Sequence, residues 1–178
     1  MILNDTEILQ AAPLSPILGG QEANGVISYG LSSFGYDIRL GTLFRFPMGG
    51  RVLDPKNCRE SDFATYRHEE PFILAANSWV LGESVETFAM QDTCLGICLG
   101  KSTYARVGIF VNVTPLEPGW KGTLTIEISN LGPNPVRIYP NEGIAQIIFL
   151  VGNRPKKAYN ERDIQKYQGQ RDAQIAKA

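Results

Sequence analysis

The chain has 178 residues, of which 43% are hydrophobic and 20% charged, and its formal net charge at pH 7 is -1. This length favours one domain with a sizeable core, expected to span residues 1–178. The small net charge gives no general reason to expect nucleic-acid binding, and no apolar run approaches the ~20 residues of a membrane span. The first ten residues lack the basic start and apolar core of a signal peptide, so a cytoplasmic location is expected.

The segments between eleven prolines and eighteen glycines are short and rich in Val, Ile, Phe, Thr and Tyr, as is typical of a β protein. The opening NDTEILQAAP predicts a short helix with Asn4 or Asp5 as its cap. The strands expected after it are YDIRLGTLFRFP, PFILAANSWVLGES, VETFAM, TCLGICLG, VGIFVNVTP, GTLTIEISN, PVRIYP and IAQIIFLV, with a helical turn from Ser102 to Arg106. Many strands in one small domain favour a jelly roll, a sandwich or a barrel.

The stretch GICLGKST, residues 96–103, looks like the phosphate-binding loop of a nucleotide triphosphatase but has the wrong spacing. That motif reads G-x-x-x-x-G-K-[ST], so its first glycine would stand at position 95, which is Leu95 here. A long helix should follow the lysine, whereas this chain soon continues with β-branched residues, glycine and proline. Any phosphate contact of Lys101 and Ser102 must therefore occur in another setting.

Three cysteines, Cys58, Cys94 and Cys98, fit free thiols in a reducing compartment better than a disulfide framework. The spacing of Cys94 and Cys98 is CxxxC, and the single histidine, His68, lies far away in the chain. A structural zinc site needs about four ligands. Buried apolar cysteines are the better interpretation, and no zinc is expected.

In GTLTIEISN the residues alternate, so that Leu124, Ile126 and Ile128 point to one face of a strand. Thr125 and Glu127 then lie on the polar face. Glu127 is either a carboxylate in water or a functional group with partners in the preceding segment. Lys101 and Arg106 of that segment are either solvated surface cations or phosphate ligands.

The tail, residues 152–178, is polar and charged with few apolar residues to bury. It is either a solvated terminus or a lid that orders over a ligand. The stretch KYQGQ, with an aromatic residue, a lysine and two amides around a glycine, suits a lid.

Several stretches together resemble the dCTP deaminase family, within the dUTPase-like superfamily, from about residue 26 to residue 171. They are SSFGYDIR (32–39), VLDPKN (52–57), CLGKSTYARVGIFVNVTPLEPGW (98–120), TLTIEISN (123–130), IYPNEGIAQIIF (138–149) and KYQGQR (166–171). The resemblance implies an all-β, distorted jelly-roll fold with a few short helices, and a homotrimer with active sites at subunit interfaces. It further implies hydrolytic deamination of dCTP to dUTP and ammonia, which supplies dUTP for pyrimidine deoxyribonucleotide synthesis. Mg2+ would be carried by the triphosphate, and dTTP would inhibit from the same pocket.

The resemblance also assigns roles by position, with Glu127 as the general acid and base and tail residues 152–178 as a nucleotide-covering segment. Ser102 and Arg106 match residues that position the water and the base. The matching nucleotide-binding residues are Lys101, Ser102, Thr103, Tyr104, Ala105, Arg106, Thr125, Ile126, Glu127, Gln146, Tyr159, Lys166 and Gln170. Zinc deaminases activate water through an H-x-E and P-C-x-x-C pattern that this chain does not have. Without metal, Glu127 must be a stronger base, which predicts a partly desolvated carboxyl with a raised pKa.

Glu117, in LEPGW, stands where relatives that also hydrolyse the triphosphate carry an aspartate before a Gly-aromatic-x-Gly turn. The longer carboxylate in a shorter loop favours deamination alone. The alternatives are a bifunctional enzyme that releases dUMP and diphosphate, and a non-catalytic nucleotide-binding regulator.

Overall fold

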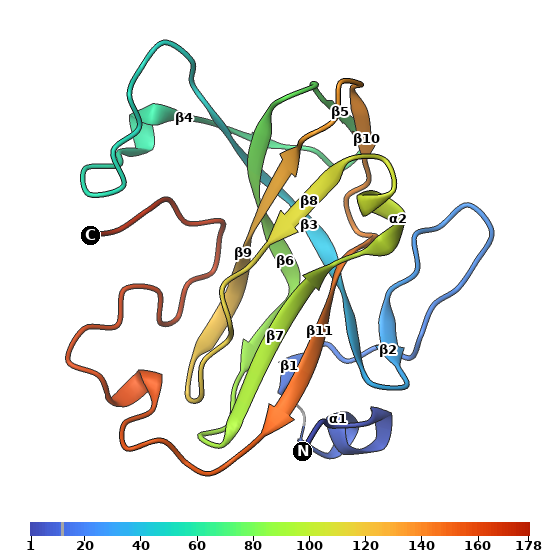
Figure 1. Ribbon diagram of the computed structural model, residues 1–178, viewed down its shortest axis with the longest axis vertical. Helices are drawn as coiled ribbons and strands as arrows, with labels where there is room; N and C mark the ends of the chain where they lie inside the picture. The colour runs from blue at the N-terminus through green and yellow to red at the C-terminus, as the bar shows by residue number, and fades with distance from the viewer. Residues whose placement is uncertain (12) are drawn as a thin grey trace.

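The computed structural model describes residues 1–11 and 13–178. In these residues it has eleven strands, two α-helices and two short 3-10 helices, which confirms the predicted all-β class (Figure 1). The helical elements are α1 (Asp5–Ala11), α2 (Ser102–Ala105), η1 (Glu60–Asp62) and η2 (Tyr159–Glu161). The strands are β1 (Leu14–Ser15), β2 (Gly30–Ser32), β3 (Gly35–Pro47), β4 (Phe63–Arg67), β5 (Phe72–Leu74), β6 (Trp79–Ala89), β7 (Cys94–Gly100), β8 (Ile109–Asn112), β9 (Lys121–Asn130), β10 (Val136–Ile138) and β11 (Gly143–Val151).

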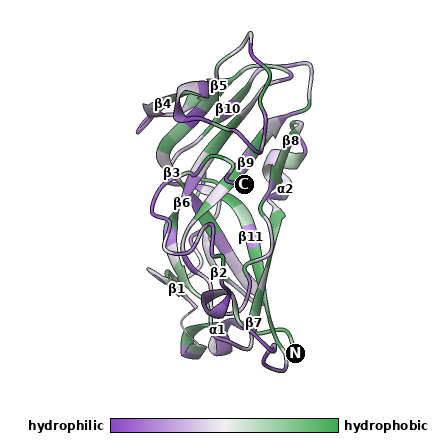
Figure 2. Cartoon of the chain, turned by 90° about the vertical axis from the view of Figure 1, so that its left-hand side faces the viewer, coloured by the Kyte–Doolittle hydropathy of each residue, from purple (hydrophilic) through white to green (hydrophobic). Residues whose placement is uncertain are grey.

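The main sheet has the strand order β7-β11-β3-β6-β9-β8, and β1, β2 and β4 pair alongside this path. Its strand pairs are antiparallel, as is the separate pair of β10 with β5. The sheet curls until its two ends, β7 and β8, come into contact, so the architecture is a nearly closed barrel. Figure 2 shows hydrophobic residues concentrated along the strands, and the largest fully buried side chains include Tyr36, Phe44, Phe88 and Phe149.

Helix α1 confirms the predicted opening helix, and Asn4 is its cap. The Asn4 side-chain oxygen accepts a hydrogen bond from the Glu7 backbone N–H at 2.9 Å, and the Glu7 carboxylate accepts one from the Asn4 N–H at 2.9 Å. This reciprocal pair satisfies two N–H groups that a helix start otherwise leaves without partners. Ala12, within the predicted stretch NDTEILQAAP, lies outside the described residues.

The strand expected over PFILAANSWVLGES is two strands, β5 and β6. Between them Asn77 has φ of +54°, in the left-handed region that asparagine tolerates, and the chain turns there. In contrast, β6 runs through Ser84 and Val85 without a break, so VETFAM is its second half. The register with β9 shifts between Glu83 and Thr87, a bulge that lets one strand serve both halves of the curled sheet.

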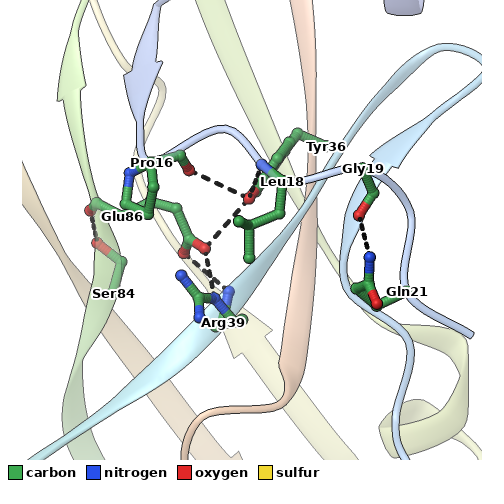
Figure 3. Close-up of polar contacts among 8 residues, drawn as sticks. All are labelled: Pro16, Leu18, Gly19, Gln21, Tyr36, Arg39, Ser84 and Glu86. Carbon is green, nitrogen blue, oxygen red and sulfur yellow. Dashed lines mark hydrogen bonds and ion pairs between the residues drawn. The ribbon is translucent and has the colours of Figure 1, made fainter. Parts of the chain in front are cut away.

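A polar cluster lies inside the barrel between β3 and β6 (Figure 3). The carboxylate of Glu86, fully buried, accepts hydrogen bonds from the Arg39 backbone N–H at 2.9 Å and the Arg39 Nε at 2.8 Å. The Tyr36 hydroxyl lies 3.3 Å from this carboxylate and accepts a bond from the Leu18 N–H. Burial and the Glu86 charge raise the pKa of Tyr36 to about 12, so it remains a donor. The cluster ties the segment before β2 to the barrel wall.

Candidate active site

Glu127 lies where the sequence pattern predicts, on the polar face of β9. Leu124, Ile126 and Ile128 are buried in the core, whereas Thr125 and Glu127 are only partly buried. In the sheet Glu127 lies opposite Leu81 of β6 on one side and Asn112 of β8 on the other. The strand therefore holds the carboxyl group rigidly at the edge of the core.

The surroundings of Glu127 favour its protonated form, as predicted. Burial raises the pKa of this carboxyl, and a hydrogen bond from Asn112 Nδ2 to Glu127 Oε2, 2.9 Å long, partly offsets the increase. Burial, together with the negative charge of Glu127, raises the pKa of the nearby Cys98 thiol to about 12. A carboxyl group with a raised pKa can both accept and return a proton near neutral pH.

Glu127 opens onto a cavity of about 990 Å³. The polar face of β9 forms one wall through Thr125 and Glu127. The other walls come from residues 53–58, from residues 113–117 and from the tail. A nucleoside base and its sugar fit a space of this size, which is typical of small-molecule sites.

Residues 53–58 overlap the stretch VLDPKN (52–57), to which the sequence analysis assigned no role. Leu53, Asp54, Pro55 and Cys58 line the cavity, as does Trp79 at the start of β6. The only sequence signal for them was the family resemblance of VLDPKN, because a polar loop does not reveal which part of the surface it covers.

The tail runs along the sheet and forms the outer wall of the cavity. In Figure 1 it follows one side of the molecule from the end of β11 to the C-terminus. Gln170 pairs with β9, since its carbonyl accepts a bond from the Thr123 N–H at 3.0 Å and its Nε2 donates to the Thr123 carbonyl at 2.6 Å. The Trp120 indole donates to the Tyr167 carbonyl at 3.1 Å. The tail is thus packed against the sheet at these points, and its role as a segment that covers a nucleotide stays a prediction.

The tail is attached at two further points. Near its start, the Arg162 guanidinium makes a two-pronged ion pair with the Glu117 carboxylate, with one hydrogen bond of 2.9 Å. Near its end, Ala173 and Ile175 are buried in a cluster with Phe63 and Leu81, which we call the tail anchor.

Of the three tail residues in the predicted site, two line the cavity and one does not. Tyr159 and Gln170 line the cavity. The Tyr159 hydroxyl accepts a bond from the Tyr167 N–H at 3.2 Å, and Gln170 Nε2 lies 3.4 Å from the Thr125 hydroxyl. Lys166 is exposed and does not line the cavity, so its ammonium group remains in solvent.

The segment KSTYAR, residues 101–106, forms the turn α2, as predicted, but does not line the cavity that holds Glu127. Ser102, Thr103 and Arg106 are exposed on it, and in Figure 1 α2 lies on the opposite side of the molecule from the tail. Thr103 instead borders a second hollow of about 650 Å³, next to residues 22–28. The preceding stretch GICLG belongs to β7, so GICLGKST is a strand followed by one helical turn, not a phosphate-binding loop.

Other members of the predicted site have partners within the fold. The Lys101 ammonium group is paired with the Asp37 carboxylate. The Tyr104 side chain is buried, and its hydroxyl accepts a hydrogen bond from the Tyr139 N–H at 2.9 Å. Gln146 Nε2 donates to the Ser32 hydroxyl at 3.1 Å. Ala105 is exposed beside Tyr104, whereas Ile126 is fully buried and can offer only its backbone.

The cysteines are reduced and two of them are poor nucleophiles. Burial raises the pKa of Cys94 to about 11, and that of Cys98 is also high, so both thiols are neutral at physiological pH. Over the residues that the structure describes, no three His, Cys, Asp or Glu side chains gather in a group that could hold a metal ion. None of the helices described is long and apolar enough to cross a membrane.

The chain is thus a curled antiparallel barrel in which a partly buried carboxyl group faces a cavity large enough for a nucleoside. These features place it among β proteins with a small-molecule site. The solved 2'-deoxycytidine 5'-triphosphate deaminase of Agrobacterium tumefaciens has this fold, with a TM-score of 0.64 at 18% identity. The match covers 85% of this chain and 48% of that longer chain.

Comparison of the amino-acid sequence identifies the family more specifically than the fold does. A sequence model of the dCTP deaminase-like family matches residues 2–151, so the chain belongs to that family. The dCTP deaminase of Campylobacter curvus is 48% identical over 163 residues, covering 90% of this chain and 87% of the relative. That of Erythrobacter litoralis is 48% identical over 177 residues, covering 96% of this chain and 95% of the relative. The resemblance seen in the sequence is thus confirmed.

Proposed function

We propose that the chain deaminates dCTP: water replaces the 4-amino group of the cytosine, giving dUTP and ammonia. The observation that carries this proposal is the Glu127 carboxyl, held with a raised pKa at the wall of the cavity. The choice of dCTP as the substrate is supported by relatives named dCTP deaminase, which are close to half identical over most of the chain.

Glu127 acts as general base and then as general acid. C4 of cytosine is a poor electrophile, so the attacking water must lose a proton as its oxygen bonds to carbon. Glu127 accepts that proton and passes it to the ring nitrogen N3. Glu127 then takes the proton of the new C4 hydroxyl and passes it to the amino group, so that the C4=O bond of dUTP forms as the C4–N bond breaks and ammonia leaves. Each step requires a carboxyl group able to hold and release a proton, and burial favours this by raising the pKa of Glu127 above its ordinary value.

The cavity of one chain lacks two residues that this chemistry needs, because Ser102 and Arg106 lie on α2, away from Glu127. A homotrimer resolves this if the α2 segment of one subunit completes the cavity of its neighbour. Exposed apolar side chains beside α2 support such a contact: Val107, Phe110 and Leu131 are each more than half exposed. The Leu131 N–H donates to the Gly108 carbonyl at 3.0 Å, which brings these residues to one patch.

The triphosphate brings its own Mg2+, which enters as part of the substrate. Thymidine and deoxycytidine nucleotides share the sugar and the triphosphate. dTTP therefore competes for the same cavity.

Deamination without further hydrolysis is supported by Glu117. Its carboxylate lines the cavity, but both of its oxygens accept bonds from Arg162. With both oxygens engaged by the guanidinium, this carboxylate has no free oxygen with which to hold and orient a second water. It therefore is not the base for a second water at the phosphates.

One assay tests the proposal. The protein is incubated with dCTP and Mg2+, and ammonia, dUTP, dUMP and diphosphate are measured. Ammonia with dUTP is the expected result. Release of diphosphate would indicate the bifunctional reaction, and the absence of any product would indicate a binding protein.

The variant Glu127→Gln tests the acid and base. It keeps the size of the side chain but cannot carry the proton, so we expect turnover to fall by about 10²-fold or more while dCTP binding persists. Near-normal turnover of this variant would remove Glu127 from the mechanism.

A further inference from the structure

We infer that Asn112 is a positioning residue for the proposed reaction: its amide fixes one oxygen of Glu127 and leaves the other to exchange protons with the substrate. The inference rests on Glu127 being the general acid and base proposed above. It adds a residue that is not in the predicted site.

The geometry follows from the pairing of β8 with β9. Asn112, the last residue of β8, lies directly opposite Glu127, so the two side chains project from the same face of the sheet. Asn112 Nδ2 donates to Glu127 Oε2 at 2.9 Å. The NH2 group of an amide donates and cannot accept a proton, so the oxygen it holds is not the one that receives a proton from water. Oε1 is the oxygen left for chemistry.

The position of Asn112 in the chain links this contact to the cavity. Directly after it, residues 113–117 leave the sheet and form part of the cavity wall. The amide therefore fixes the carboxyl group at the point where the wall begins. The Asn112 side chain is exposed, so it does not contribute to packing of the core. We therefore assign its role to the hydrogen bond with Glu127.

The charge state of Glu127 depends on what surrounds it on each neighbouring strand and loop. Cys98 of β7 is neutral, as its pKa of about 12 requires, and Leu81 of β6 is apolar. Further along the same face, Glu83 has a pKa raised by burial and by Asp172 of the tail. Across the cavity lie the carboxyl groups of Asp54 and Glu117.

Among these groups Asn112 has a specific effect. It is the side chain that donates a hydrogen bond to the Glu127 carboxylate, and it lowers a pKa that burial raises. Because the amide is neutral, it does so without competing for the proton. A carboxylate in the same place would share the proton with Glu127 and raise its pKa further.

The test compares Asn112→Leu with the wild type through the pH dependence of kcat/KM for dCTP. Loss of a hydrogen bond to a charged group should raise the pKa of Glu127, so the acid limb should move up by about one pH unit. In addition, kcat on the plateau should fall by about tenfold or more, because the carboxyl group is no longer oriented. Asn112→Asp should move the same limb further upward, because the new carboxylate adds a like charge.

Ser129→Ala is the matched control, since Ser129 lies on the same face of β9, two residues beyond Glu127, opposite Phe110. Its pH profile should equal that of the wild type, and the thermal midpoint of each variant checks that it folds. An unchanged acid limb and plateau in Asn112→Leu, while Glu127→Gln is inactive, would overturn the inference and leave the proposed function standing. An active Glu127→Gln would instead remove the proposed function.

Discussion

Ile175 of the tail anchor offers a quantitative test of how the tail is held on the sheet. Its side chain is 8% exposed, in contact with the cluster of Phe63 and Leu81. Ile175→Ala removes three carbons from this cluster. At about 0.8 kcal/mol for each buried carbon, the docked tail loses about 2.4 kcal/mol, before any cost of the cavity left behind. The population of the detached tail should then rise by about 60-fold, since about 1.4 kcal/mol corresponds to a factor of ten.

Limited trypsin digestion measures this population through cleavage after Arg171. The bonds that Gln170 and Gln174 make with Thr123 and Thr125 hold the chain on both sides of Arg171, so cleavage requires the tail to detach. When detachment is fast relative to cleavage, the cleavage rate follows the detached population. We therefore expect Ile175→Ala to be cut up to about 60-fold faster than the wild type, and dCTP to slow the cutting of both.

The control is the same substitution in the same tail at Ile164, which is 72% exposed. Ile164→Ala should be cut at the wild-type rate. If Ile175→Ala is cut no faster than Ile164→Ala, while its thermal midpoint is unchanged, the tail is not held by its anchor.

Two further predictions concern the barrel and the shared site. Glu86→Gln should lower the free energy of unfolding, measured in urea, by about 3–5 kcal/mol, because it leaves the Arg39 charge without its buried partner. Asp163→Asn, at the exposed ion pair with Lys157, should cost at most about 1 kcal/mol, and equal losses would contradict the role of burial. Glu127→Gln and Arg106→Ala, each inactive alone, should together recover about a quarter of wild-type activity when co-expressed, since random assembly of trimers with shared interfacial sites restores one site of three in most trimers. A mixture as inactive as its components would exclude a site shared between subunits.

The place of Glu127 could be predicted from the sequence because strand alternation is a local property. GTLTIEISN alternates over its whole length, so the side of the sheet to which Glu127 points follows from residues two positions apart. Its raised pKa could also be predicted, since a deaminase without metal needs a stronger base. Its partner Asn112 could not, because Asn112 and Glu127 are 15 residues apart and meet only through the pairing of β8 with β9.

The attachment of the tail illustrates the same limit over a longer range. A polar composition predicts either a solvated terminus or a lid, because it does not show which hydrogen-bond partners the rest of the chain offers. The contacts that hold the tail are distant in sequence: Arg45 Nε donates to the Ala173 carbonyl, 128 residues away. Lys101 is a similar case, because its charge suggested a phosphate ligand whereas the fold pairs it with Asp37, 64 residues before it.

The attachments of the tail also bear on the timing of a catalytic cycle. With Arg162 bound to Glu117, Gln170 bound to β9 and Ile175 buried in the tail anchor, the tail lies along the cavity as a strap held at several points and not as a free flap. In the proposed reaction, product release would require part of this strap to detach, and the ion pair is the attachment that salt weakens by screening. A strap that is held more firmly would then retain nucleotide at the expense of turnover, so the strength of these attachments would help to set the rate of the proposed reaction.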